Sequence, residues 1–355
     1  MKGRVKNILS ILMIFSFIIS MISINSSYAK TNSNRKIVVF EENVDQVKKD
    51  KILEKHGVTK VKEIIGTNAV VVHVSSDDLL INEPDIRYIE DDMIISISGK
   101  VNDDDSTIKA KKIDEIRPEQ PEEVIPWGVQ YMEAPDIWAI TKGDGVKVAI
   151  IDTGVDIDHP DLVDNIKGGY NTITKKGSYD DDNGHGTHIA GTIAASDNEI
   201  GVIGVAPEVD LYSIKSFDSN GEGYVSDIIE AIEWSIVNDI DIINMSFGFI
   251  MKSTALYESI LDASNAGIVM VAAAGNNYGG YAEYPAAYPE VVSIGGIDEV
   301  GNPADFSARN GVDIWAPSTS IYSTYINDDY VEMDGTSMAT AHWTGKFILQ
   351  MRTNN

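Results

Sequence analysis

The spacing of apolar residues predicts two structural units of different kinds. Between residues 36 and 96, the strand-like stretches KIVVFE, VKEIIG, AVVVHV and IRYIEDD are interrupted by helical spacing in NVDQVKKDKILEKHG and SDDLLIN. The resulting order, β-α-β-β-α-β, predicts a small ferredoxin-like α+β module, to which we assign residues 30–100.

From Ile125 onwards the pattern is different. The continuous apolar stretches VKVAIID, VDLYSIKSF, DIINMS and IVMVAAAG alternate with helical stretches such as VSDIIEAIEWSIVND and STALYESILDASNAG. Apolar strands that alternate with helices predict an α/β fold with a mostly parallel, doubly wound sheet and helices on both faces. Because ligands of such sheets bind beyond the carboxyl ends of the strands, functional side chains are expected at that edge.

The N-terminus has the pattern of a targeting segment. Lys2, Arg4 and Lys6 precede the apolar stretch ILSILMIFSFIISMISI, and Ser27 and Ala29 are small residues before the expected cleavage point. This predicts a secretory signal peptide at residues 1–29, with an uncleaved membrane anchor as the alternative because the apolar stretch is long. Cleavage would give a secreted, extracellular protein with no stable membrane association.

Residues 101–122 form an acidic linker between the two units. Its charged side chains, its two prolines and its lack of apolar periodicity predict an exposed segment that is open to proteolysis. The whole chain has 55 Asp and Glu against 28 Lys and Arg, a net charge of −27, which argues against a nucleic-acid partner. The absence of cysteine excludes disulfides, thiolate metal sites and a cysteine nucleophile.

Three polar residues are expected at the edge of the α/β sheet. Asp152 ends VKVAIID, His185 lies at the start of a small-residue helix in NGHGTHIAG, and Ser337 opens the final helix. A carboxylate, an imidazole and a hydroxyl together suit nucleophilic catalysis, and Asn276 after AAAG suits stabilisation of an oxyanion. Each residue alone also fits a turn, a helix cap or a structural histidine, so their common location is what indicates catalysis.

The stretches AIIDTGVDIDHPDL, NGHGTHIAGTIAA, AAAGN and DGTSMAT occur in this order and resemble the subtilisin family of secreted serine proteases. The resemblance implies an endopeptidase that forms an acyl-enzyme on Ser337, with His185 as the base. It further implies that Asp152 orients the imidazole and that Asn276 donates to the oxyanion.

The resemblance also assigns roles to whole segments. Residues 123–355 look like the peptidase domain, which would act on polypeptide substrates as a monomer. Residues 30–100 look like the inhibitory pro-region of the family, a partner in cis that assists folding and is cut away within linker 101–122. An independent binding domain is the alternative for the N-terminal module.

A structural Ca²⁺ site is implied as well. The stretch SDNEIGV is similar to the calcium loop of the family, and two preceding segments would complete an all-oxygen ligand set. The implied ligands are Glu123, Asp161, Ser196, Asn198, Ile200 and Val202.

The resemblance implies a cleft whose edges hold an extended peptide. The implied lining residues are Gly221, Glu222, Gly223, Ser246, Phe247, Gly248, Ala273, Ala274, Gly275 and Glu283. Glu283 matches the base of the pocket for the residue before the scissile bond (P1), where a carboxylate favours Lys or Arg. A solvent-facing loop glutamate is the alternative. Phe249, where the family usually has glycine, is expected to narrow the cleft.

After Thr340 the chain departs from the family pattern. Ala341 stands where the family has proline, and Trp343 and Lys346 lie in a stretch that is usually small or apolar. An enclosed lysine needs a partner, and an indole is expected to overpack. The short remainder predicts a truncated C-terminus. The second hypothesis is therefore a catalytically incompetent relative that acts as a binding or inhibitory protein.

Overall fold

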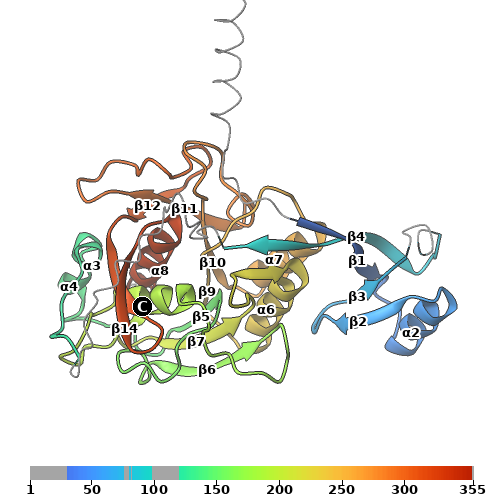
Figure 1. Ribbon diagram of the computed structural model, residues 1–355, viewed down its shortest axis with the longest axis horizontal. Helices are drawn as coiled ribbons and strands as arrows, with labels where there is room; N and C mark the ends of the chain where they lie inside the picture. The colour runs from blue at the N-terminus through green and yellow to red at the C-terminus, as the bar shows by residue number, and fades with distance from the viewer. Residues whose placement is uncertain (1–29, 76–79, 81, 98–119, 354–355) are drawn as a thin grey trace, which may run out of the picture.

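The computed structural model describes residues 30–75, 80, 82–97 and 120–353. The predicted signal peptide and almost all of the predicted linker lie outside these residues. The described chain has a large α/β part and a smaller N-terminal module beside it (Figure 1). No helix in these described ranges is long and apolar enough to cross a membrane.

A parallel seven-stranded sheet forms the centre of the α/β part. Its order is β12-β11-β10-β9-β5-β7-β6, and every neighbouring pair is parallel. The strands are β5 (Lys147–Asp152), β6 (Ile166–Asn171), β7 (Asp210–Lys215), β9 (Ile242–Met245), β10 (Val269–Ala273), β11 (Val291–Ile297) and β12 (Ile314–Pro317). The predicted mostly parallel sheet is confirmed.

Helices cover both faces of this sheet because alternate residues of each strand face opposite sides. In β5, Val148 and Ile150 join the apolar cluster that includes helices α5 (His185–Ala194) and α8 (Thr336–Thr353). Ala149 and Ile151 instead join the cluster on the other face. That second cluster includes residues of α6 (Val225–Val237) and α7 (Thr254–Asn265).

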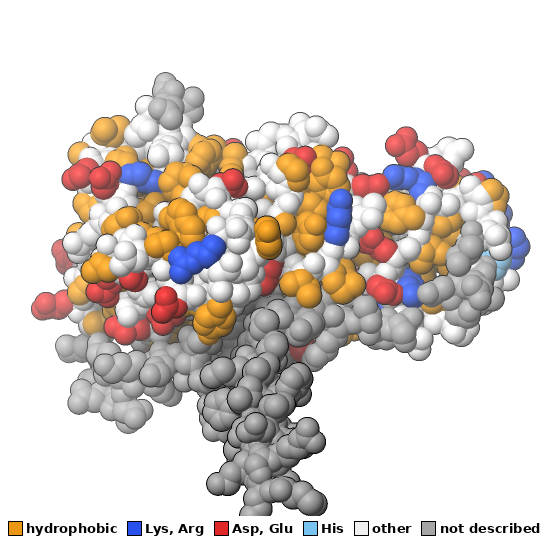
Figure 2. All heavy atoms as spheres, turned by 90° about the horizontal axis from the view of Figure 1, so that it is seen from above, with side chains coloured by type: hydrophobic (Ala, Val, Ile, Leu, Met, Phe, Trp, Pro, Cys, Tyr) orange, Lys and Arg blue, Asp and Glu red, His pale blue; other side chains and the backbone are white. Residues whose placement is uncertain are grey.

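Smaller elements complete this part. They are α3 (Trp127–Tyr131), α4 (Ala134–Ile137), β8 (Glu222–Tyr224) and the hairpin of β13 (Ile321–Tyr325) with β14 (Asp329–Met333). Acidic side chains are spread over the face shown in Figure 2 rather than gathered in one patch.

The N-terminal module is an antiparallel sheet with a helix. It consists of β1 (Lys30–Phe40), α2 (Gln46–Lys55), β2 (Thr59–Glu63), β3 (Ala69–His73) and β4 (Ile86–Ser96), in the sheet order β2-β3-β1-β4. The predicted strand pair, β2 with β3, is present. The predicted helix SDDLLIN falls mainly outside the described residues, so the ferredoxin-like assignment stays a prediction.

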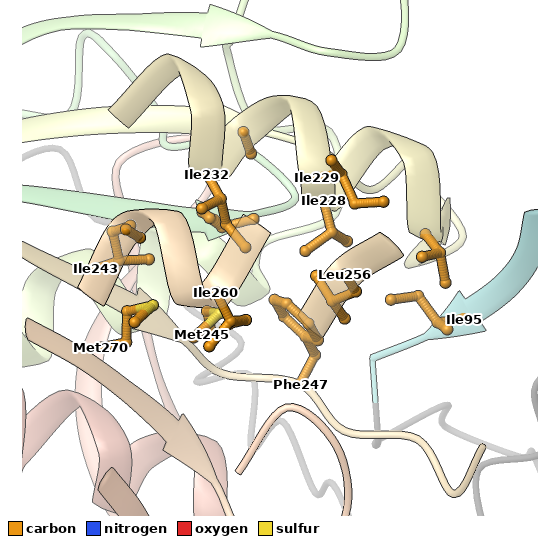
Figure 3. Close-up of a cluster of buried hydrophobic side chains, with 14 of the residues drawn as sticks. Ile95, Ile228, Ile229, Ile232, Ile243, Met245, Phe247, Leu256, Ile260 and Met270 are labelled. Atoms are coloured by element: carbon orange, nitrogen blue, oxygen red, sulfur yellow. The ribbon is translucent and has the colours of Figure 1, made fainter. Parts of the chain in front are cut away.

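The module packs directly on the α/β part. Strand β4 pairs antiparallel with β8, so the two parts share one sheet. Ile95 of β4 is buried and points into a cluster formed by Ile228 and Ile229 of α6, Leu256 of α7 and Phe247 (Figure 3). This contact joins the apolar cores of the two parts.

Helix α8 accommodates the residues that depart from the family pattern. The Lys346 ammonium donates to the main-chain carbonyl of Met132 at 2.5 Å and lies 3.8 Å from the Glu133 carboxylate. Trp343 is only partly buried and packs against the core cluster that contains α5 and α8. The lysine therefore has the partner that it needs, and the indole lies at the border of the core.

Candidate active site

Asp152 and His185 meet at the carboxyl edge of the sheet. Asp152 ends β5 and is fully buried, while His185 is the first residue of α5. His185 Nδ1 lies 2.8 Å from Asp152 Oδ1, which also accepts the N–H of Thr153 at 2.8 Å. Because an ionised carboxylate only accepts, this contact places the proton on Nδ1 and leaves Nε2 as the basic nitrogen.

A glycine next to His185 allows this close approach. A Cβ on Gly186 would lie 2.0 Å from the carbonyl oxygen of Gly154, so no larger residue fits there. The Gly186 N–H instead donates to Thr153 Oγ1 at 3.0 Å. The motif NGHGTH therefore brings the start of α5 against the end of β5.

Ser337 lies at the start of α8, which packs against α5. Its hydroxyl is almost completely buried and donates to the main-chain carbonyl of Ser246 at 2.8 Å. The Ser246 hydroxyl in turn donates to the Ser337 carbonyl at 3.1 Å. The described contacts include no hydrogen bond between Ser337 and His185, so the Ser337 hydroxyl must rotate away from Ser246 to reach the imidazole.

Asn276 is held with a defined amide orientation. Its Oδ1 accepts the N–H of Thr336 at 3.0 Å and the Thr336 hydroxyl at 3.0 Å. Since these two bonds occupy the amide oxygen, the Nδ2 donor is the group left to interact with substrate. Nδ2 would lie 3.5 Å from a Cβ built on Gly335, two residues before Ser337.

The first predicted edge of the cleft is paired with an extended segment of the same chain. Ile95 and Ser96 of β4 lie opposite Gly223 and Glu222, and the Ile97 N–H donates to the Gly221 carbonyl at 2.9 Å. The backbone of this edge therefore binds an extended strand in antiparallel orientation.

The other predicted lining segments meet around Glu283, which lies between residues 246–248 and 273–275. A Cβ on Gly248 would be 2.8 Å from Glu283 Oε2, and one on Gly275 would be 2.7 Å from its Cδ. Within these segments, Ala273 and Ala274 are buried, and the Phe247 ring packs 5.0 Å from that of Phe217 in the core. Only the main chain of Phe247 is therefore suited to line a cleft.

Glu283 is not a solvent-facing loop residue, because it is only 4% exposed. Oε1 accepts from Asn277 Nδ2 at 3.3 Å, and Oε2 is buried with no hydrogen-bond partner among the described residues. Burial raises the pKa of this carboxyl to about 7, although the Asn277 hydrogen bond opposes the shift. Phe249 is also fully buried, with its ring beside that of Tyr284, so it fills the core instead of narrowing the cleft.

The predicted calcium ligands come together around Asp161. Asp161 Oδ2 accepts from the Val202 N–H at 3.0 Å and from the Tyr330 hydroxyl at 3.0 Å, while Oδ1 is buried without a partner. Burial raises the pKa of Asp161 to about 6, and the charge of Glu123 adds to the shift. A buried carboxylate oxygen without a donor fits a bound cation.

The remaining calcium-loop residues surround this carboxylate. Glu123 Oε1 accepts the Asn198 N–H at 2.9 Å, and the Ser196 N–H donates to the Asp161 carbonyl at 2.9 Å. Asn198 Oδ1 accepts the Ile200 N–H at 3.1 Å. Among the described residues no cluster of three or more acidic or histidine side chains is suited to a metal ion. The six predicted calcium ligands do not form a cluster of this kind, because three of them are main-chain carbonyls.

Two other buried histidines are unsuited to the role of base. Burial lowers the pKa of His188 to about 3 and that of His342 to about 4, so both are neutral at ordinary pH. His188 Nε2 donates to the Ile321 carbonyl at 2.9 Å, and His342 Nδ1 donates to the Met338 carbonyl at 2.8 Å. Both therefore have structural roles.

Sequence reasoning missed Lys215. This lysine ends β7 opposite Asp152 in the sheet, and its ammonium contacts the Thr153 carbonyl and the Asp182 carboxylate. The available signal was a lysine near the end of the strand-like stretch VDLYSIKSF.

Comparisons with known proteins identify the family of this chain. The Subtilase family matches residues 143–355. The chain is 34% identical to the thermostable alkaline protease of Halalkalibacterium halodurans, over 94% of this chain and 85% of that protein. It is 36% identical to subtilisin E of Bacillus subtilis (95% and 85%) and 42% identical to subtilisin Savinase of Lederbergia lenta (65% and 85%). The chain therefore belongs to the subtilase family.

It is a subtilisin-like serine endopeptidase, and its substrates are polypeptides. The relatives favour this function over the alternative of a catalytically incompetent binding or inhibitory protein. Subtilisins generally bind calcium.

Proposed function

We propose that Ser337, His185 and Asp152 carry out peptide hydrolysis. Ser337 Oγ attacks the peptide carbonyl carbon while its proton passes to His185 Nε2, and Asp152 holds Nδ1–H and stabilises the imidazolium. The proton then passes to the leaving amine nitrogen as the peptide bond breaks. Water hydrolyses the resulting acyl-enzyme by the same route. The observation that carries this proposal is the 2.8 Å contact between His185 and Asp152.

Asn276 is proposed to stabilise the oxyanion that forms on the substrate carbonyl. Two bonds from Thr336 fix its amide oxygen and leave Nδ2 as the donor. Such a donor, oriented before the reaction, contributes about 3 kcal/mol to transition-state stabilisation.

The N-terminal module is proposed to be an inhibitory pro-region that also assists folding. Two observations support this role. Strand β4 pairs along the edge at Glu222–Tyr224, where a substrate would bind. Asp92 accepts the Ser226 N–H at 2.9 Å and Glu90 accepts the Thr254 N–H at 2.8 Å. The module therefore supplies carboxylates to N–H groups in the first turns of α6 and α7, which have no partner within the helix.

The protein is accordingly proposed to be made as an auto-inhibited precursor. Residues 1–29 would direct secretion to the extracellular space, cleavage within 101–122 would separate the pro-region, and residues 123–355 would act as a monomeric peptidase. The acidic, proline-containing composition of the linker supports cleavage there.

A structural Ca²⁺ is proposed at Asp161. The side chains of Glu123, Asp161 and Asn198 would bind it, together with main-chain carbonyls of residues 196, 200 and 202. The supporting observation is the buried, unpartnered Oδ1 of Asp161. The ion would neutralise these carboxylates and tie the start of the peptidase domain to its body, where the Val124 N–H already donates to the Gly201 carbonyl at 2.9 Å.

Glu283 is proposed to favour Lys or Arg at P1. Its buried carboxylate lies between the two segments that would form the walls of the pocket, and Oε2 has no donor among the described residues. A substrate cation would supply that donor.

The catalytic proposal is tested with the full chain and a Ser337→Ala variant, both expressed with Ca²⁺. Wild type is expected to cleave itself in the linker and then hydrolyse a peptide substrate, and the variant is expected to remain an intact precursor. Identical intact precursor from both would contradict the proposal.

A further inference from the structure

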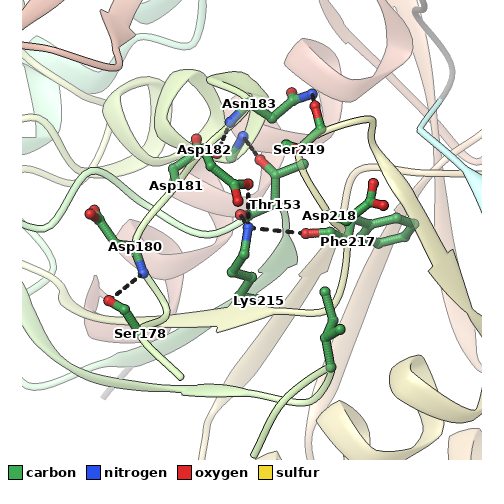
Figure 4. A network of polar contacts seen from close by, with 12 residues as sticks. Thr153, Ser178, Asp180, Asp181, Asp182, Asn183, Lys215, Phe217, Asp218 and Ser219 are labelled. Carbon is green, nitrogen blue, oxygen red and sulfur yellow. Dashed lines mark hydrogen bonds and ion pairs between the residues drawn. The ribbon is translucent and has the colours of Figure 1, made fainter. Parts of the chain in front are cut away.

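Lys215 joins three segments at the catalytic edge (Figure 4). Its side chain is only 7% exposed. The ammonium donates to the Thr153 carbonyl at 2.5 Å, to Asp182 Oδ1 at 2.6 Å and to the Phe217 carbonyl at 3.2 Å. An ammonium has three donors, and here each one has a partner.

Each of these partners belongs to a different part of the site. Thr153 follows Asp152, and Asp182 lies in the loop that enters α5 at His185. Phe217 precedes the edge at 221–223, where an extended chain pairs. Lys215 therefore connects the aspartate, the histidine and the backbone that binds substrate.

Asn183 also connects the loop that enters α5 to the loop that precedes the edge at 221–223. Asn183 Oδ1 accepts the His185 N–H at 3.2 Å, and Asn183 Nδ2 donates to the Ser219 carbonyl at 3.1 Å. This contact is exposed, whereas the Lys215 contacts to Thr153 and Phe217 are buried. Hydrogen bonds are stronger away from water, so Lys215 is the firmer of the two connections.

We propose that Lys215 is a positioning residue that keeps the substrate-binding edge 221–223 in register with Asp152 and His185. It does not touch the reacting atoms. A peptide that pairs along this edge relies on the register to bring its scissile bond to Ser337, whereas a substrate that reaches only the P1 pocket does not. The proposal rests on the catalytic roles assigned above.

The test compares a tetrapeptide anilide with a single-residue ester in wild type, Lys215→Met and Asp182→Asn. For the anilide, kcat is expected to fall about tenfold or more in Lys215→Met with little change in KM, because bound peptide lies out of register. The ester is expected to lose much less. Asp182→Asn should show the same pattern more weakly.

Asp182→Asn also covers the case in which Lys215→Met does not fold, because the Asp182 side chain is 56% exposed. Asp180→Asn, in the same loop without a bond to Lys215, is the matched control. Equal losses on both substrates, a larger loss on the ester, or no loss would overturn the proposal. Failure of the catalytic assignment is seen separately, as ester hydrolysis that survives in Ser337→Ala.

Discussion

The main chain of Gly66, in the turn after β2, lies directly against the carboxylate of Glu233 on α6. A Cβ on Gly66 would be 2.6 Å from Glu233 Oε2, and the Glu233 side chain is buried beneath the N-terminal module. From α7, the Ser259 hydroxyl donates to Oε1 at 2.8 Å, and the charge of Asp262 opposes ionisation. Burial raises the pKa of Glu233 from 4.5 to about 7.

This relationship predicts that the module binds more tightly at acidic pH. Departure of the module uncovers Glu233, whose pKa then returns towards 4.5. The raised pKa belongs to the bound state. Glu233 therefore contributes fully to binding of the module below about pH 4.5, and this contribution is lost as the pH rises to about 7. Between pH 4.5 and 7 the affinity of the module for the peptidase should fall by up to about tenfold per pH unit. Above pH 7, Glu233 should cause no further change in this affinity.

The measurement uses the self-processed complex, incubated at a series of pH values and then diluted into one assay buffer. The initial rate on a fluorogenic peptide reports the fraction of enzyme that has been released. Glu233→Gln should flatten the pH dependence, whereas Glu258→Gln, which removes the partner of Arg87 in the same interface, should not. A Glu233→Gln profile that coincides with wild type would refute the prediction.

Glu283 predicts a pH-dependent preference at P1. Its carboxyl is neutral below a pKa of about 7 and charged above it, so selectivity for a cationic P1 residue should grow as the pH rises through 7. The ratio of kcat/KM for P1 Lys to that for P1 Leu is the appropriate measurement, because the titration of groups that both substrates need cancels in the ratio. A charge-assisted hydrogen bond predicts a rise of about tenfold or more.

Glu283→Gln preserves shape and removes the charge. It should give a low ratio that does not vary with pH. A wild-type ratio that is equally flat, or a variant that keeps the wild-type P1 profile, would show that Glu283 does not contact the P1 side chain.

The sequence predicted the sheet and the chain positions of the candidate site because both depend on local patterns. The apolar stretch VKVAIID forms a buried strand that ends in Asp152. NGHGTH needs glycine at position 186, because a Cβ there would lie 2.0 Å from the Gly154 carbonyl oxygen. Such signals lie within a few residues of the groups that they position.

Contacts between distant segments could not be predicted in this way. Nothing near Glu233 in the sequence indicates that Gly66 covers it, and nothing near Lys215 indicates bonds to Thr153 and Asp182. The direction of the Ser337 hydroxyl, towards the Ser246 carbonyl, depends on a contact across 91 positions. These features arise from tertiary packing, which sequence spacing does not encode locally.

Calcium removal should destabilise the peptidase through Asp161. In a Ser337→Ala background, which prevents self-digestion, a chelator should lower the Tm by about 5–10 °C if the ion is normally near saturation. Asp161→Asn should lower the Tm in Ca²⁺ and abolish the effect of the chelator. Asp164→Asn, at an exposed carboxylate nearby, should keep the wild-type response. A chelator effect that persists in Asp161→Asn would place the ion elsewhere.

Asn276 offers a test that separates chemistry from structure. Asn276→Ala removes both the Nδ2 donor and the oxygen that Thr336 binds, whereas Asn276→Asp keeps that acceptor and replaces the donor with a carboxylate oxygen. If Nδ2 stabilises the oxyanion, both variants should lose about 10²–10³ in kcat with little change in KM, because the interaction forms in the transition state. Thermal unfolding should show a lower Tm for Asn276→Ala than for Asn276→Asp. An Asn276→Asp enzyme with near wild-type kcat would mean that Asn276 acts only by holding Thr336 at the start of α8.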